Sequence, residues 1–291
     1  MPVFRWIKST FSSTLFSLII LMLFLIPPFP SLLPNSSAED KGVLITPTRI
    51  IFEGRTRTAS VKLINPNNYE QTYKISLVTI RMDQYGTRTE AGNPTEAELS
   101  VQSMIRFSPR RATIPANGWQ TVRLMVRKPR DLPDGEYRTQ LKVEPLPMEK
   151  TSARQSGSDR ISINIDVVFH VSIPVIIRHG QTRAAATPHA PRLVNRDGRP
   201  FLETRIKREG NASVYADVKA LLNPESEGGS RTLVGEIKGI SIYSQNSEQI
   251  VYLPVKNPEA LTRGPVDIEI TSREKKEAPI IGNGRFDVRF D

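Results

Sequence analysis

Side chains that commonly carry catalysis or bind metals are few in this sequence. Cysteine is absent from the 291 residues, and the three histidines, His170, His179 and His189, lie nine and ten residues apart. That spacing matches no common metal-ligand pattern, and without cysteine there is no thiol catalysis, no disulfide and none of the commonest zinc sites. The sequence also contains no Gly-x-Ser-x-Gly elbow, phosphate loop or His-Glu-x-x-His motif. We therefore expect a protein that is not an enzyme and that uses no cofactor or metal.

One glycine-rich tripeptide, Gly282-Asn283-Gly284, could be mistaken for part of a dinucleotide-binding loop. It lacks the third glycine and the strand-to-helix context of such a loop. We interpret it as a hairpin turn.

The charge of the chain is basic, with 40 Lys and Arg against 30 Asp and Glu and a formal net charge of +10. Acidic residues are interspersed among the basic ones, as in residues 205–209, and no cluster of aromatic residues accompanies them. Nucleic-acid binding proteins concentrate basic residues on one face and often add stacking aromatics. We expect a solvated basic surface and no nucleic-acid partner.

The first 38 residues are typical of a secretory signal peptide. Arg5 and Lys8 form a basic start, residues 11–26 are apolar, and Ser36-Ser37-Ala38 offers small residues for cleavage. The apolar run has 16 residues, which is short of the roughly 20 needed to span a bilayer. We predict cleavage after Ala38 and no stable membrane insertion afterwards; an uncleaved anchor is the alternative.

From Lys41 onward, short alternating runs separated by turn residues predict an all-β fold. No long amphipathic helix is expected. Seven strands within about 140 residues are typical of an antiparallel β-sandwich. The first six strands are expected at residues 42–52, 59–64, 71–81, 104–107, 120–126 and 138–144, with turns at Asn65-Pro66-Asn67-Asn68, Tyr85-Gly86, Asn117-Gly118 and Pro133-Asp134-Gly135.

The seventh strand is an unusually long alternating stretch, residues 161–175. Its odd positions are apolar, and most of its even positions are polar, which is the two-residue period of a strand. Ordinary strands have about five or six residues, so this stretch can cover the core of its domain and still present an apolar row. The odd positions are Ile161, Ile163, Ile165, Val167, Phe169, Val171, Ile173 and Val175.

The rest of the chain predicts a second β-sandwich. Residues 180–191 are small, polar and bounded by proline, and we interpret them as a linker. Further strands are expected at residues 213–221, 237–243, 249–253, 266–271 and 285–291. The predicted organisation is a signal peptide (1–38), a first immunoglobulin-like domain (41–180) and a second β-sandwich domain (181–291).

Asp134-Gly135-Glu136-Tyr137-Arg138-Thr139 resembles the tyrosine corner of immunoglobulin-like domains. In that motif, a tyrosine at the start of the penultimate strand hydrogen-bonds back across the corner. Thr139 stands where antibody domains have a cysteine, in agreement with a core that contains no disulfide.

Five short fragments follow one another in the first half of the chain: TPTRIIFEG (46–54), VKLIN (61–65), FSPRRATIP (107–115), QTVRL (120–124) and LP (132–133). In this order they resemble the amino-terminal domain of periplasmic pilus chaperones. The long alternating stretch takes the place of the last strand of that family's domain. Glu136 and its neighbours stand where the family commonly has an Arg-Glu-Ser signature, which indicates a divergent member.

The resemblance implies a two-domain immunoglobulin-like chaperone of the chaperone-usher pathway, located in the periplasm. Its partners would be pilus or fimbrial subunits, which receive a donated strand, and an outer-membrane usher, which receives the subunits. An extended strand added to an open sheet edge supplies backbone hydrogen bonds while alternate side chains enter pockets. The expected donor row is Ile161, Ile163, Ile165 and Val167.

The resemblance also implies that two basic residues bind the terminal carboxylate of the subunit. Arg49 matches the first through its Thr-Arg-hydrophobic-hydrophobic-Phe context, and a guanidinium can donate two parallel hydrogen bonds to a carboxylate. The family's second residue is usually a lysine on the even face of the last strand; here that region offers His170 or Ser172 instead, and His170 is the expected carboxylate-binding residue. Two alternatives stay open: an immunoglobulin-like envelope protein that binds or supports without donating a strand, and a long strand whose odd residues all face the core.

Overall fold

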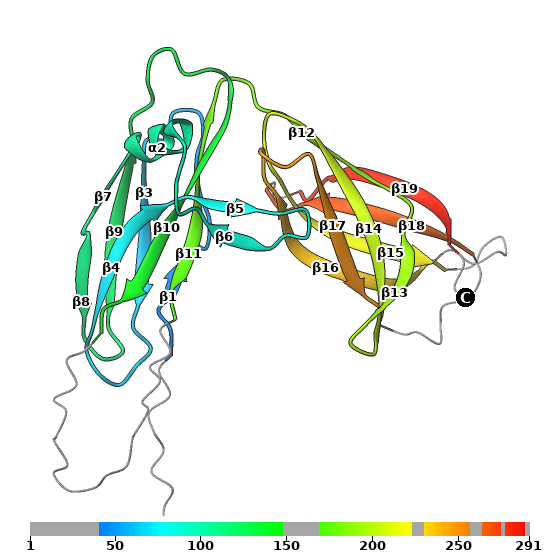
Figure 1. Cartoon of the computed structure of the whole chain (residues 1–291), viewed down its shortest axis with the longest axis horizontal. Helices are drawn as coiled ribbons and strands as arrows, with labels where there is room; N and C mark the ends of the chain where they lie inside the picture. Colours follow the sequence, from blue (N-terminus) through cyan, green and yellow to red (C-terminus); the bar gives the residue numbers. More distant parts are fainter. Residues whose placement is uncertain (1–40, 148–168, 223–229, 257–263, 275–276, 289–291) are drawn as a thin grey trace, which may run out of the picture. The chain divides into compact units, whose positions relative to one another are not determined.

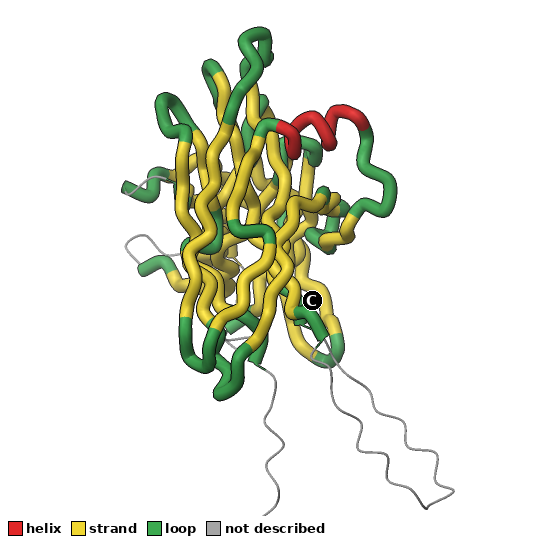
Figure 2. The backbone as a smooth tube through the Cα atoms, turned by 90° about the vertical axis from the view of Figure 1, so that its left-hand side faces the viewer, coloured by secondary structure: helices red, strands yellow, loops and turns green. Residues whose placement is uncertain are grey.

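The computed structural model of the chain describes residues 41–147, 169–222, 230–256, 264–274 and 277–288 (Figure 1). The predicted signal peptide, residues 1–38, lies outside the described residues. The prediction of an all-β fold with two immunoglobulin-like sandwiches is confirmed: strands dominate the described residues, with a single helix, α2 (Glu96–Ser103), among them (Figure 2). Within these ranges no helix has the length and apolar character needed to cross a membrane.

The first sandwich consists of two sheets in the arrangement typical of immunoglobulin-like domains. One sheet has the strand order β1-β3-β9-β7, and the other has the order β2-β11-β10-β4-β8. The first contains β1 (Leu44–Thr46), β3 (Thr58–Ile64), β9 (Trp119–Val126) and β7 (Ile105–Ser108), and the second contains β2 (Ile50–Phe52), β11 (Val171–His179), β10 (Gly135–Pro145), β4 (Gln71–Val78) and β8 (Arg111–Ile114).

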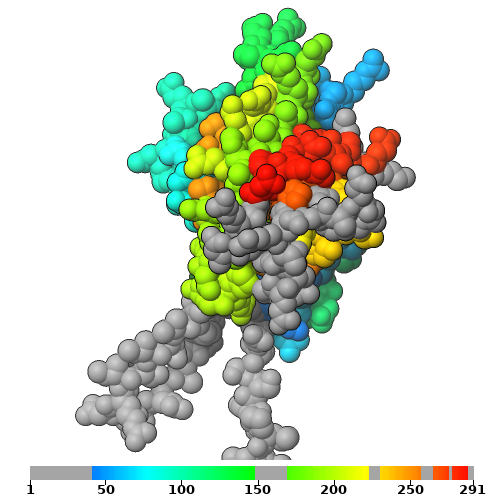
Figure 3. Space-filling model, turned by 90° about the vertical axis from the view of Figure 1, so that its right-hand side faces the viewer, coloured from blue at the N-terminus to red at the C-terminus, as the bar shows by residue number. Residues whose placement is uncertain are grey.

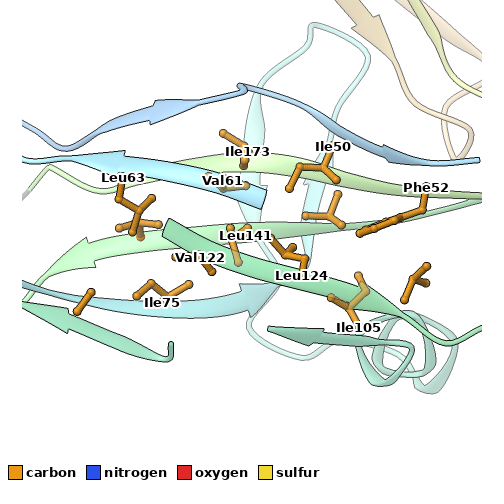
Figure 4. Close-up of a cluster of buried hydrophobic side chains, with 14 of the residues drawn as sticks. Ile50, Phe52, Val61, Leu63, Ile75, Ile105, Val122, Leu124, Leu141 and Ile173 are labelled. Atoms are coloured by element: carbon orange, nitrogen blue, oxygen red, sulfur yellow. The ribbon is translucent and has the colours of Figure 1, made fainter. Parts of the chain in front are cut away.

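The core of this sandwich lies between the two sheets, where side chains from both point toward one another (Figure 4). Val61 and Leu63 of β3 are buried while their neighbours Ser60 and Lys62 are exposed, because successive side chains of a strand point to opposite faces. Burial of each such side chain contributes roughly 1.5 to 3 kcal/mol. The alternation in the sequence therefore selects which face of each strand turns inward.

The first predicted strand, residues 42–52, is in fact two strands in opposite sheets. β1 pairs with β3 in an antiparallel way, whereas β2 pairs with β11 in a parallel way. Pro47 lies between them, and a proline has no backbone N–H with which to continue a ladder. The chain thus crosses from one sheet to the other just before Arg49.

Two elements of the first sandwich were not predicted from the sequence: a helix and a short hairpin. Helix α2 begins at a capping box, in which Thr95 and Glu98 satisfy each other's backbone N–H groups. The expected strand at residues 71–81 ends at Val78, and a short hairpin follows, formed by β5 (Ile80–Met82) and β6 (Arg88–Glu90). The predicted turn at Tyr85-Gly86 lies at its tip, with Gly86 at a φ of 83°.

The second sandwich has its own hydrophobic core. One sheet is built on β14 (Arg199–Gly210), which pairs with β12 (Ala184–Pro188), β13 (Arg192–Arg196) and β17 (Glu248–Pro254). The other has the order β16-β15-β18-β19. Its strands are β16 (Thr232–Ile242), β15 (Val214–Leu222), β18 (Gly264–Ser272) and β19 (Ile280–Val288).

Two interpretations of the sequence are wrong in this half. The expected linker, residues 180–191, contains β12, which pairs with β14. Gly282-Asn283-Gly284 is no turn but lies inside β19, paired with β18. A Cβ atom on Gly282 would lie 1.9 Å from the Ala186 carbonyl oxygen, so glycine is required for β19 to approach β12. Figure 3 shows β19, in red, at the surface of this sandwich.

Candidate functional site

The edge of the sheet at β11 is partly open. β2 covers only three residues of β11, with Ile50 opposite Val175 and Phe52 opposite Ile177. On the other side, β10 pairs with all of β11 from Val171 to His179. Among the described residues, therefore, residues 171–174 of β11 have a strand partner on one side only, and their free side continues the sheet edge.

The predicted donor row precedes this open edge in the sequence. Ile161, Ile163, Ile165 and Val167 lie outside the described residues. Phe169, the next apolar odd position, is exposed, whereas Ile173, Val175 and Ile177 are buried in the first core. The carboxyl-terminal part of the stretch thus closes the first sandwich, and the strand continues past Val175 to His179.

Arg49 lies immediately before β2 and is largely buried, with 12% of its side chain exposed. Its guanidinium contacts three oxygen atoms at long distances: Ser213 Oγ at 3.4 Å, Ser241 Oγ at 3.5 Å and Glu274 Oε1 at 3.5 Å. It also stacks over the ring of Tyr215, at 4.5 Å from the ring centre.

These contacts leave Arg49 short of strong partners. Its buried Nε has no hydrogen-bond partner, although a buried donor without a partner is costly. Burial lowers the pKa of Arg49, and the nearby Glu274 carboxylate offsets this only in part. Arg49 is therefore a largely buried cation whose hydrogen bonds are all long.

Beside Arg49 lies a buried ion-pair network centred on Arg178, at the end of β11. Arg178 donates to Glu136 Oε2 at 3.2 Å and to both oxygens of Glu274, at 2.7 and 2.8 Å. Glu136, whose side chain is fully buried, also accepts hydrogen bonds from the backbone N–H and the hydroxyl of Ser213. These bonds join residues of β10 and β11 to residues beside β15 and β18.

The electrostatics of this network favour the charged form of Arg178. Burial alone would lower its pKa, but hydrogen bonding and the charges of Glu274 and Glu136 outweigh burial, so the pKa is raised. Arg49 and Arg178 share one atom, Glu274 Oε1, at 3.5 and 2.7 Å. Two guanidinium groups thus converge on one carboxylate oxygen.

His170, the expected second basic residue, is not brought to Arg49. The pairing of Ile50 with Val175 places Arg49 level with Pro174, four residues beyond His170. At about 3.3 Å per residue, this corresponds to roughly 13 Å along the strand. His170 precedes β11 and is exposed, and the basic residue that meets Arg49 at Glu274 is Arg178.

Sequence reasoning missed Arg178 because this residue lies just beyond the alternating stretch. An arginine that follows the unbroken apolar run Val175-Ile176-Ile177 was a usable signal, since a charged residue is rarely buried without a partner. The partners, however, come from Glu136 and Glu274, 42 and 96 residues away.

The tyrosine corner predicted at Tyr137 is confirmed. Its hydroxyl donates to the Pro133 carbonyl oxygen at 2.9 Å. Thr139, at the position of the missing cysteine, is buried and donates to the Val78 carbonyl oxygen at 3.0 Å. The corner positions the start of β10, and with it Glu136.

The site brings buried arginines and carboxylates together, and Arg178 is joined to Glu136 and Glu274 in ion pairs. Among the described residues, no group of His, Asp and Glu side chains is arranged to hold a metal ion.

Comparison with known proteins gives one family match. Residues 42–179 match the family model described as pili and flagellar-assembly chaperone, PapD N-terminal domain. No curated protein matches the chain.

Solved structures similar to this chain include the Escherichia coli chaperone DraB, with 12% identity over 87% of this chain and 100% of that chain and a TM-score of 0.43. The chaperone–tip adhesion subunit complex CsuC–CsuE from archaic chaperone-usher Csu pili of Acinetobacter baumannii has 16% identity over 84% and 97%, with a TM-score of 0.44. The Salmonella enterica SafA pilin in complex with the SafB chaperone gives 13% identity over 84% and 95%, with a TM-score of 0.41.

Proposed function

Since residues 42–179 belong to the pili and flagellar-assembly chaperones as a PapD N-terminal domain, we propose that this protein binds pilus or fimbrial subunits by strand donation. In this proposal it stabilises each subunit in the periplasm and delivers it to an outer-membrane usher. The chaperone performs no chemical turnover.

The open edge of β11 is the observation that carries the proposal. Residues 171–174 have a strand partner on one side only among the described residues, and the apolar row Ile161, Ile163, Ile165 and Val167 precedes them directly in the chain. An exposed apolar edge favours association with another strand. A subunit that lacks one of its own strands is a partner of the matching shape and chemistry.

The donor row supplies enough free energy to hold an unstable subunit. Burial of one large aliphatic side chain contributes roughly 1.5 to 3 kcal/mol before association and ordering costs. Three or four such side chains therefore contribute roughly 5 to 12 kcal/mol before those costs, which is comparable with the stability of a typical domain, about 5 to 15 kcal/mol.

Arg49 is the residue proposed to bind the subunit's terminal carboxylate. Its long contacts and unpartnered Nε leave room for a carboxylate that hydrogen-bonds to it more closely. Arg178 is the proposed second cation, because it already binds the carboxylate that Arg49 approaches. A carboxylate anchored there would fix the register in which the subunit pairs with β11.

The donor row is tested by placing a charge on either face of the same stretch. Ile163→Asp and Ile165→Asp should abolish the ability of the protein to keep a co-expressed pilin-like subunit soluble, because an ionised carboxylate cannot enter an apolar pocket of the subunit. The measurement is the soluble fraction of the subunit and its co-purification with the chaperone.

Ser162→Asp and Asn164→Asp are the matched controls, since they add the same charge on the opposite face of the stretch. Their subunit yield should equal that of the unmodified chain. Equal subunit yields for all four variants, with chaperone melting temperatures unchanged, would contradict strand donation and favour an immunoglobulin-like envelope protein that binds in another way.

A further inference from the structure

A second basic feature lies beside the Arg49 site and shares Arg178 with it. The first sandwich contains an open pocket of about 520 Å³ whose walls come from three separate segments. Gly54 and Arg57 follow β2, residues 128–130 follow β9, and the third segment is the last two residues of β11 with Gly180 after them. Arg49 does not line this pocket.

The lining of this pocket is positively charged. Arg57, Lys128, Arg130 and Arg178 contribute four cationic side chains, His179 adds an imidazole, and no carboxylate lines the pocket. Within the described parts of the chain, Arg57, Lys128 and Arg130 form no ion pair, whereas Arg178 is paired with Glu136 and Glu274. Clustered cations without counter-charges repel one another.

Three acidic side chains border the pocket without lining it. Glu274 and Glu136 pair with Arg178 at 2.7 and 3.2 Å, and the Asp134 carboxylate lies against Gly180. A fourth, Glu53, has its carboxylate 3.7 Å from Arg178 Nη1 and a side chain that is 60% exposed. Glu53 therefore faces solvent and balances only part of the positive charge.

The side chain of Lys128 is held in place by a hydrogen bond. Its ammonium group donates to the Arg178 carbonyl oxygen, which holds the charge in place. Burial lowers the pKa of Lys128, and the charge of Arg57 lowers it further, while Glu53 opposes this shift. A bound anion would relieve both effects, because it would compensate the ammonium and the guanidinium together.

We propose that this pocket, the Lys128 pocket, binds a phosphate-type oxyanion. Arg178 is already ion-paired. The guanidinium groups of Arg57 and Arg130 and the Lys128 ammonium offer more donors than a single carboxylate can accept, and arginine forks match the tetrahedral oxygens of a phosphate. The pocket volume admits a phosphate that carries an organic group. The source is a soluble phosphate compound or the headgroup of an acidic phospholipid, which share this chemistry.

The test uses the full chain, inorganic phosphate and two kinds of vesicle. Sodium phosphate, titrated at constant ionic strength against sodium chloride, should raise the melting temperature in a saturable way, because a ligand that binds only the folded state stabilises it. In a second arm, flotation compares vesicles of phosphatidylglycerol with vesicles of phosphatidylcholine.

The combined variant Lys128→Gln and Arg130→Gln should weaken binding by roughly tenfold or more, because charge-assisted hydrogen bonds are lost. The control, Lys207→Gln with Lys238→Gln, removes the same net charge from exposed lysines outside the pocket. Arg130→Gln alone, at an exposed position, serves if the combined variant does not fold.

A phosphate response that the pocket variant loses and the control keeps supports a soluble source. Binding to phosphatidylglycerol vesicles alone, lost in the pocket variant, supports a lipid headgroup. The proposal is overturned if the protein responds to neither probe, or if pocket and control variants respond equally.

Discussion

At the scale of single residues, the distinctive feature is a buried arginine with weak partners. Arg49 contacts Ser213, Ser241 and Glu274 only at 3.4 to 3.5 Å, whereas Arg178 holds Glu274 at 2.7 and 2.8 Å. Arg178 is therefore the more strongly paired of the two proposed cations, and Arg49 has more capacity left for a subunit carboxylate. This difference makes Arg49 the residue whose loss should affect binding more than folding.

Arg49→Ala should weaken binding of a subunit peptide that ends in a free carboxylate by roughly ten- to a hundredfold, as expected for loss of a charge-assisted bidentate bond. Fluorescence anisotropy with the free-acid and the amidated form of the same peptide measures the effect. The amidated peptide should bind both proteins equally.

Arg273→Ala is the matched control, because Arg273 also lies over the Tyr215 ring but pairs with Asp217 instead of Glu274. Its affinity for the free-acid peptide should stay close to that of the unmodified chain. An equal loss for free-acid and amidated peptides in Arg49→Ala would exclude a carboxylate contact.

At the scale of elements, helix α2 depends on one acidic side chain. Glu98 accepts from the Thr95 backbone N–H at 2.7 Å and from Arg81 at 2.8 and 3.1 Å. The Arg81 hydrogen bond and the capping bond lower the pKa of Glu98 from 4.5 to about 2. This carboxylate thus ties the first turn of α2 to β5.

The sign of the resulting pH effect follows from the lowered pKa. The stabilisation by Glu98 is present above pH 4.5 and is lost as the pH falls toward 2, because the unfolded chain binds the proton more readily. Amide hydrogen exchange in α2, compared with exchange in β9, should therefore accelerate selectively over this range.

Glu98→Gln should remove this selective pH dependence. Glu96→Gln is the control, since Glu96 lies in the same first turn without a capping role. If hydrogen exchange in α2 still accelerates at low pH in Glu98→Gln, the pH dependence must come from a group other than Glu98.

At the scale of the whole molecule, two separate hydrophobic cores belong to one compact unit, Lys41–Asp291. Polar residues connect them: Glu136 of β10 binds Ser213 before β15, and Arg178 of β11 binds Glu274 after β18. Because these groups are buried, loss of one partner leaves another uncompensated.

Glu136→Gln should lower the free energy of unfolding by roughly 1 to 3 kcal/mol, since Arg178 keeps Glu274 as a partner. Calorimetry should show a lower and broader transition as the two cores become less coupled. Glu209→Gln, which breaks the exposed pair with Lys207, should change stability by about 0 to 1 kcal/mol. A single, equally sharp transition at an unchanged temperature in Glu136→Gln would refute the coupling.

The sequence predicted much of the strand content and little of the site. Alternation placed β3, β9 and β15 within a few residues, and the tyrosine corner at Tyr137 followed from its local motif. Two segments were predicted wrongly: residues 42–52 as one strand and residues 180–191 as a linker. The crossing between sheets at Pro47 and the pairing of β12 with β14 both depend on strands that are distant in the sequence.

Taken alone, the sequence determined the all-β class, the scarcity of catalytic groups and the family resemblance, because a period of two residues and short motifs are local properties of the chain. Only the tertiary structure decided that Arg178, rather than His170, shares a carboxylate with Arg49. The shared carboxylate belongs to Glu274, 225 residues from Arg49 and 96 from Arg178. Contacts across such separations follow from sheet order and register, which local patterns do not encode.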